Sequence, residues 1–147
     1  MPLSEYAKEW KNDYEKLIEM EQTSQLTWAI LILTSGLGFI TLHIEIKALP
    51  NANLIVFIFG VLVIGIFDFC FYRIVVGFAR IATYIECLKP ISRVYRKEFK
   101  STTIFTKLYN LFVKVDRRKI EPRRWITALT IALVDSFLIL YLIFQFL

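Results

Sequence analysis

"LIVFIFGVLVIGIFDFCFYRIVVGF", residues 54–78, contains only two charged side chains, Asp68 and Arg73. A helix needs about 20 mostly apolar residues to cross a bilayer, so this stretch is long enough for one crossing. Two further stretches of the same kind, residues 26–44 and 125–147, lie on either side of it. The chain of 147 residues is 56% apolar and 21% charged, which is more apolar than a typical soluble domain. The sequence therefore predicts an all-α integral membrane protein with three transmembrane helices.

The distribution of Lys and Arg predicts the orientation of these helices. Residues 80–124 contain thirteen Lys and Arg and residues 1–24 contain three, whereas residues 45–53 contain one and none follows Trp125. Positively charged loops stay on the cytoplasmic side of a membrane. We therefore expect a protein of the bacterial inner (plasma) membrane with a cytoplasmic N-terminus and an outside C-terminus. Residues 25–79 form a transmembrane hairpin in this prediction.

The N-terminal segment, residues 1–24, has the pattern of an amphipathic helix. Its apolar residues recur at spacings of three and four, and no Pro or Gly separates it from the first span, so the two are expected to form one helix. Its polar side chains include six acidic and three basic residues, whereas membrane-surface helices are normally rich in Lys and Arg. This helix is therefore expected to pack on protein, and residues 80–124, with thirteen bases and four acids, are the nearest candidate.

Residues 80–124 are predicted to form a basic cytoplasmic segment of two helices. The first continues the second span until Pro90, which cannot donate a backbone hydrogen bond. Pro122 is expected near the first turn of the third span. The second helix is predicted from an apolar stripe with helical spacing: Ile104, Leu108, Leu111, Phe112 and Val115.

Five bases cluster just before the third span: Arg117, Arg118, Lys119, Arg123 and Arg124. They have two interpretations. Contact with anionic lipid headgroups stabilises such segments by about 1 kcal/mol per base. Alternatively, the cluster binds a soluble anion such as a nucleotide or nucleic acid. The sequence contains neither a glycine-rich phosphate loop nor an RNA-binding motif that would support the second interpretation.

The third span carries one carboxylate, Asp135. On a helix it shares a face with Ala128, Ala132 and Ser136, while apolar residues such as Phe137 occupy the opposite face. An aspartate facing lipid at the centre of a span would cost roughly 2.5–3.5 kcal/mol. We therefore expect Asp135 to face protein or water.

The other two spans carry comparable polar positions. Thr34, Gly38 and Thr41 share a face of the first span, and Asp68 lies in the second. Counted from the outer ends of their spans, Asp68 and Asp135 lie at similar depths of about 21 and 18 Å. Two such carboxyl groups can share a proton, bind a cation, or meet their copies in an oligomer. Because three helices cannot enclose an aqueous pore and still bury three polar faces, a homo-oligomer is expected.

Enzymatic and metal-dependent functions have little support in the sequence. The chain has a single histidine, His43, and two cysteines, Cys70 and Cys87, so neither a metal site nor a disulfide framework is predicted. Two aspartates without a surrounding motif do not form a catalytic constellation. We therefore expect no catalytic residues, no metal and no cofactor, and a protein that is not an enzyme.

The order of segments resembles that of SLATT-type small membrane effectors of bacterial conflict and anti-phage systems. The similarity covers residues 4–115 and is greatest in "YEKLIEMEQTSQLTWAILI", residues 14–32. It consists of a cytoplasmic helix leading into the first span, a tight outer hairpin, a second span and a cytoplasmic continuation. The third span has no counterpart in the two-span core of that family. The resemblance implies an oligomeric pore-forming effector in antiviral defence, held closed until a partner or nucleotide signal opens it.

The alternative function is that of a membrane anchor or scaffold. In that case residues 80–124 recruit a cytosolic protein partner, and the two aspartates are dispensable. The ion-channel hypothesis differs because it requires the intramembrane carboxyl groups and places the functional residues within the spans.

The predicted orientation can be tested by cysteine accessibility. In a background without Cys70 and Cys87, a cysteine replacing Asn51 should react with an impermeant thiol reagent added outside intact cells. A cysteine replacing Ser101 should react only after the membrane is permeabilised. The reverse labelling pattern would show that the basic segment faces outward.

Overall fold

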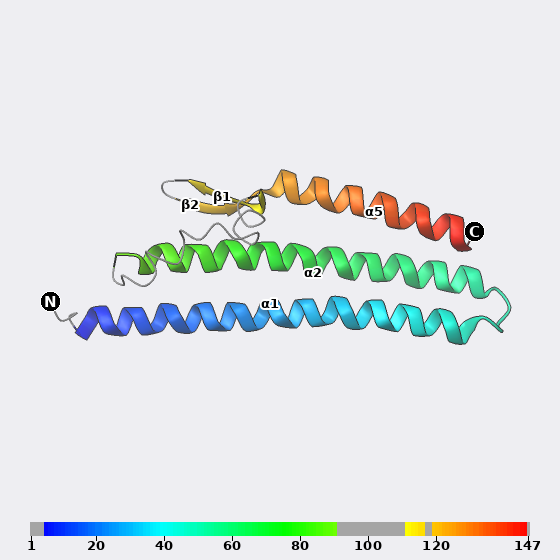
Figure 1. Cartoon of the computed structure of the whole chain (residues 1–147), viewed down its shortest axis with the longest axis horizontal. Helices are drawn as coiled ribbons and strands as arrows, with labels where there is room; N and C mark the ends of the chain where they lie inside the picture. Colours follow the sequence, from blue (N-terminus) through cyan, green and yellow to red (C-terminus); the bar gives the residue numbers. More distant parts are fainter. Residues whose placement is uncertain (1–4, 91–110, 117–118, 147) are drawn as a thin grey trace.

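The described residues form three long helices and one β-hairpin, arranged with their long axes nearly parallel (Figure 1). The computed structural model describes residues 5–90, 111–116 and 119–146. All three helices are long and apolar enough to cross a membrane. In chain order the elements are α1 (Glu5–Ile46), α2 (Ala52–Leu88), β1 (Val113–Asp116), β2 (Lys119–Pro122) and α5 (Arg124–Phe146).

Helix α1 joins the N-terminal amphipathic segment and the first span without a break, as predicted. At 1.5 Å per residue its 42 residues measure about 63 Å, roughly twice the thickness of a bilayer's hydrocarbon core. Helix α2 has 37 residues and also continues past its span, ending two residues before Pro90 as the sequence predicts. Residues 5–25 of α1 therefore extend about 30 Å beyond the span, and residues 79–88 of α2 extend about 15 Å.

A short turn reverses the chain between α1 and α2. The Leu49 amide donates to the Ile46 carbonyl at 2.9 Å, and the Ala52 amide donates to the Leu49 carbonyl at 3.2 Å. Asn51 has a φ of 62°, in the left-handed region. Asn is one of the few residues with a side chain that adopts this conformation readily. The turn makes α1 and α2 antiparallel neighbours along most of their length (Figure 1).

The β-hairpin corrects the C-terminal end of the predicted second helix in the basic segment. Leu111 and Phe112 are helical, but Val115 lies in strand β1, which pairs with β2 in antiparallel register. In the two four-residue strands, "VKVD" and "KIEP", apolar and polar positions alternate with a period of two, which favours strand pairing over a helix. Ile104 and Leu108 lie outside the described residues.

Pro122 ends β2 and lies two residues before α5 begins at Arg124, which agrees with its expected place near the first turn of the third span. A proline is tolerated at the end of an edge strand because its missing N–H removes no essential hydrogen bond between the strands. The basic segment is therefore helical up to Leu88, and its described remainder is mainly a hairpin.

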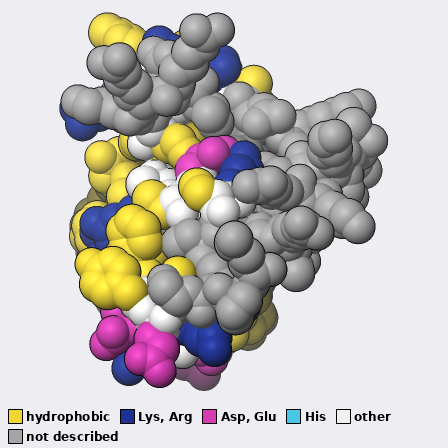
Figure 2. Space-filling view, turned by 90° about the vertical axis from the view of Figure 1, so that its left-hand side faces the viewer, with side chains coloured by type: hydrophobic (Ala, Val, Ile, Leu, Met, Phe, Trp, Pro, Cys, Tyr) yellow, Lys and Arg dark blue, Asp and Glu magenta, His cyan; other side chains and the backbone are white. Residues whose placement is uncertain are grey.

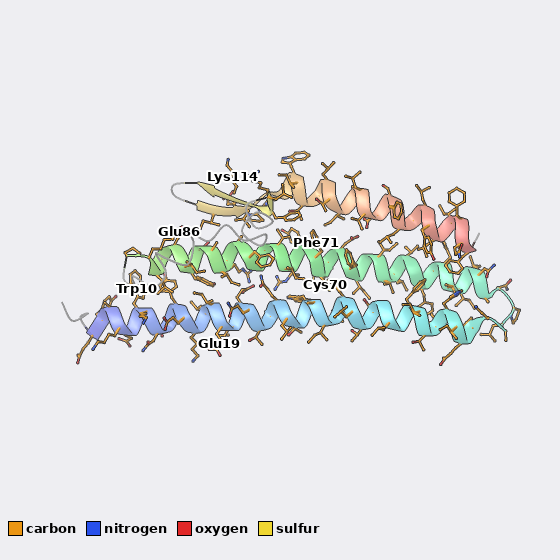
Figure 3. All side chains as sticks on the ribbon, viewed as in Figure 1. Trp10, Glu19, Cys70, Phe71, Glu86 and Lys114 are labelled. Carbon is orange, nitrogen blue, oxygen red and sulfur yellow. The ribbon has the colours of Figure 1, made fainter. Side chains whose placement is uncertain are left out.

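The hairpin and α5 lie on one side of α2, and α1 lies on the other (Figure 1). Phe112, just before β1, makes an edge-on contact with Phe71 of α2, with ring centroids 5.6 Å apart. Figure 3 shows Phe71 directed toward the hairpin side, whereas Cys70 lies between α2 and α1. Cys70 is completely buried. Helix α2 is thus the central element on which the other elements pack.

Two glycines of α2 permit close approach of the neighbouring helices. A Cβ added to Gly60 would lie 2.8 Å from Leu142 Cδ1 of α5, and one added to Gly77 would lie 2.9 Å from Glu21 Oε1 of α1. A Cβ added to Gly65, by contrast, would meet nothing within 4 Å. Small residues at the first two positions bring the helix backbones together in the way typical of membrane interfaces.

Replacing these glycines by leucine provides a test of the packing. Gly60→Leu and Gly77→Leu should each destabilise the fold by about 1–3 kcal/mol, because the new side chain overpacks a filled contact. Gly65→Leu is the matched control and should have little effect. In a Cys87→Ser background, the temperature at which buried Cys70 becomes reactive to a thiol reagent reports the loss of packing. Equal midpoints for all three variants would contradict the close approach.

Candidate functional site

Asp68 of α2 and Asp135 of α5 face each other across the interface between these helices. Their carboxyl groups lie within range of a Coulombic interaction and of a side-chain hydrogen bond. Both residues are half-buried, and one oxygen of each, Oδ1, is buried without a hydrogen-bond partner among the described residues. This placement agrees with the expectation that Asp135 faces protein or water, and its neighbour within the chain is Asp68.

The geometry of this pair limits its ionisation. Two ionised carboxylates so close together repel each other, and the repulsion is stronger in a low-dielectric medium than in water. A shared proton or a bound cation removes the repulsion and completes the hydrogen bonding. No group of three or more His, Cys, Asp or Glu in the described part of the chain is arranged to hold a metal ion. The pair is therefore a candidate site for a proton or for a weakly held monovalent cation.

The remaining polar residues predicted for this site lie elsewhere. Thr34, Thr41 and Gly38 are exposed on α1, and Ser136 is exposed on α5. Each hydroxyl donates to the carbonyl four residues earlier in its own helix, at 3.0 Å for both threonines and 2.7 Å for Ser136. A Cβ at Gly38 would meet nothing within 4 Å. Of the six residues predicted to form one polar face, the structure brings together only the two aspartates.

The surface of α5 otherwise follows the predicted division. Leu133 and Phe137, assigned to the lipid face, are 65% and 74% exposed. Ala128 and Ala132 are also exposed, so their small side chains form an open strip beside the aspartate pair. A second helix could approach α5 closely along this strip, since small residues allow near contact of backbones in lipid.

The sequence did not identify the individual polar partners that join α1 and α2. Glu21 forms a salt bridge with Arg80 at 3.5 Å, and Gln25 Nε2 donates to the Ile74 carbonyl at 3.2 Å. Glu21 and Gln25 are separated by four residues and therefore lie on one face of α1. This spacing in the sequence could have indicated that Glu21 and Gln25 share a polar face, but it does not reveal which residues of α2 lie opposite them.

Arg73 also has its partner on α1. Its guanidinium lies 5.5 Å from the centroid of the Trp28 ring, and Trp28 makes an edge-on contact with Phe69. A cation over an aromatic face is stabilised by the ring's quadrupole, and the effect is larger where water is excluded. Arg73 is therefore directed toward α1.

The predicted contact between the N-terminal helix and residues 80–124 is present. Tyr14 lies against Tyr84, with ring centroids 6.0 Å apart, and against Trp10 at 5.5 Å. Cys87 lies beside the Tyr14 hydroxyl, and a hydrogen bond between the two side chains raises the pKa of the Tyr14 phenol. Viewed end-on, α1 displays acidic and basic side chains at its exposed N-terminal end (Figure 2). The contact is thus mainly aromatic, with the Glu21–Arg80 ion pair as its described charged component.

Part of the predicted basic cluster borders a hollow at the start of α5. Arg123 and Arg124 line this hollow together with Lys114 of β1 and Trp125, which is 90% exposed. Arg117 and Arg118 lie outside the described residues, as does the side chain of Lys119. Lys114 was not among the predicted site residues, because its proximity to Arg123 depends on the unpredicted hairpin.

No family model, curated protein or solved structure matches this chain. The resemblance to SLATT-type effectors therefore remains an expectation, and the site is defined by its geometry.

A double-mutant cycle tests whether the two aspartates are partners. Asp68→Leu and Asp135→Leu should each destabilise the protein by about 1–3 kcal/mol, because each leaves one buried carboxyl group without a partner. The double variant should be no less stable than either single variant, because no unpaired carboxyl group remains. Asp68→Asn should preserve stability, since its amide donates to the remaining carboxylate. Thermal unfolding in detergent gives the comparison, and additive losses in the double variant would contradict the pairing.

Proposed function

We propose that this protein is a homo-oligomeric effector of the bacterial inner membrane that forms an ion-conducting pore when triggered. The observation that carries the proposal is the Asp68–Asp135 pair, which lies in two helices long and apolar enough to cross a membrane. Intramembrane carboxyl groups are costly and are normally retained for ion or proton pathways. The expected role in antiviral defence comes from the resemblance to SLATT-type effectors.

The carboxyl pair supplies a cation-selective element to such a pore. When it holds either a single proton or a single monovalent cation, the pair carries one net negative charge. Release of the proton or cation into an adjacent water-filled path leaves repelling carboxylates, which favours capture of the next cation. The Oδ1 atoms of Asp68 and Asp135 have no hydrogen-bond partner among the described residues, so they are available to bind that cation.

Assembly is needed because one chain does not surround a path. Helix α2 contacts both α1 and α5, and large apolar side chains cover much of the remaining surface. The open strip at Ala128 and Ala132 lies beside Asp135 and allows a helix of another copy to approach. Packing along this strip would place the carboxyl pair at or near a boundary between subunits, where a path can form.

The trigger is expected to act on the long extensions of α1 and α2. These extensions contact each other through the Glu21–Arg80 salt bridge and the Tyr14–Tyr84 ring contact. In the predicted orientation they face the cytoplasm, where a cytosolic protein or a nucleotide signal can reach them. The same feature favours the alternative function of a membrane scaffold that recruits a cytosolic partner through residues 80–124.

Ion flux from liposomes distinguishes the two functions. If the carboxyl groups act in a pore, Asp135→Asn and Asp68→Asn should retain oligomer size but lower cation-over-anion permeability severalfold. Ala128→Leu and Ala132→Leu should reduce both oligomer size and flux, because bulky side chains block close approach. The controls Leu133→Ala and Phe137→Ala alter exposed apolar positions of α5 and should leave both quantities nearly unchanged.

A scaffold gives a different pattern of results. Both asparagine variants should then behave like the wild type in every assay, whereas neutralising the bases of residues 80–124 should abolish partner recruitment. Wild-type permeability and oligomer size in Asp135→Leu would rule out the pore proposal, since this variant removes both the charge and the hydrogen-bonding group.

A further inference from the structure

We infer that the hollow at the junction of the hairpin and α5 is a binding site for the phosphate of an anionic phospholipid headgroup. This hollow, the junction site, is lined by two polar strand residues and by the first residues of α5. Its lining residues are Lys114, Glu121, Pro122, Arg123, Arg124, Trp125 and Ile126.

The charge of the junction site selects an anion. Lys114, Arg123 and Arg124 contribute three positive charges, and Glu121 contributes one negative charge, so the net charge is +2. Lys114 and Glu121 are opposite each other in the antiparallel register of the hairpin. Glu121 therefore offsets part of the positive potential, and its removal should strengthen anion binding.

The backbone holds one of these cations in a fixed position. The Arg123 amide donates to the Phe112 carbonyl at 2.7 Å, which ties Arg123 to the start of the hairpin. The Arg123 carbonyl accepts from both the amide and the hydroxyl of Thr127, each at 3.0 Å. Thr127 is buried, with 2% of its surface exposed. Because these bonds act on both sides of Arg123, the junction between the strand and the helix is preorganised.

The depth of the junction site identifies the source of the phosphate. Arg124 is the first residue of α5, which is a candidate membrane span, and Trp125 is 90% exposed next to it. Exposed tryptophans at the ends of spans lie at the level of the lipid headgroups. At that level phospholipid phosphates are far more concentrated than soluble anions. A guanidinium group also matches the geometry of a phosphate, to which it can donate two hydrogen bonds.

The proposal is independent of pore formation, because it concerns the hairpin and the start of α5. In this proposal, lipid binding at the junction site holds the hairpin against the membrane surface. Loss of this lipid contact would release the hairpin from the headgroup layer without altering the carboxyl pair.

Quenching of Trp125 fluorescence by brominated lipids tests the proposal. The protein carries Trp10→Phe and Trp28→Phe, so that only Trp125 emits, and is reconstituted in phosphatidylcholine bilayers containing brominated phosphatidylglycerol or brominated phosphatidylcholine. Phosphatidylglycerol should quench more strongly, with a severalfold larger association constant. Lys114→Gln, Arg123→Gln and Arg124→Gln should each reduce that preference by up to about fivefold.

Two controls separate binding at this site from general attraction to a charged surface. Glu121→Gln should increase the preference for phosphatidylglycerol, a change that misfolding cannot produce. Lys16→Gln removes an exposed cation on α1 and should leave the preference unchanged. Equal quenching by the two lipids in the starting protein would overturn the proposal, as would a preference that is insensitive to all three cation variants.

A final arm distinguishes a lipid from a soluble phosphate compound. Inorganic phosphate is added at constant ionic strength, with chloride as the balancing ion. An unchanged preference for phosphatidylglycerol supports the headgroup assignment. Complete loss of the preference at millimolar phosphate would show that the site binds soluble phosphate instead, and would overturn the assignment to lipid.

Discussion

The packing of α1 and α5 on opposite sides of α2 is the constraint on which the rest of the structure depends. Helix α2 supplies Gly77 to the contact with α1 and Gly60 to the contact with α5, and a side chain at either position would overlap its neighbour. The same helix supplies Asp68 to the carboxyl pair and Phe71 to the hairpin contact. A hydrocarbon environment gives no hydrophobic driving force between helices, so in the predicted membrane-embedded state close packing and polar contacts would hold these elements together. Each polar contact is consequently tied to the position of α2.

The two polar regions of α2 have different characters. Toward the N-terminal end of α1, Glu21 and Arg80 compensate each other's charge, and Gln25 satisfies a backbone carbonyl. Such contacts fix the relative position of two helices. In the span itself, Asp68 faces a group of the same charge, and the pair requires a proton or cation from outside the protein. The first region is therefore suited to structural support, and the second is suited to exchange with the surroundings.

Local features of the sequence were sufficient to predict the helices but not their partners. Hydropathy and helical spacing identified the three spans, the continuity of α1 and the end of α2 before Pro90, because these depend on neighbours along the chain. Whether Asp68 and Asp135 face each other depends on the rotation of α5 about its axis, which the sequence does not specify. Val115 was assigned to the end of a helix because it fits helical spacing with Leu111 and Phe112, and each strand has only four residues to establish its own period. Lys114 was missed for the same reason.

The lengths of α1 and α2 outside the span have a mechanical consequence. Residues 5–25 of α1 form a straight extension of about 30 Å that belongs to the same helix as the first span. A tilt of about 10° at the membrane surface would move the tip of such an extension by about 5 Å, following from its length. Conversely, a molecule that pushes on the tip exerts torque on the intramembrane half of the helix. Because α1 is unbroken from Glu5 to Ile46, a force applied at Trp10 is transmitted along the same helix to Phe39, whose ring packs beside Gly60 of α2.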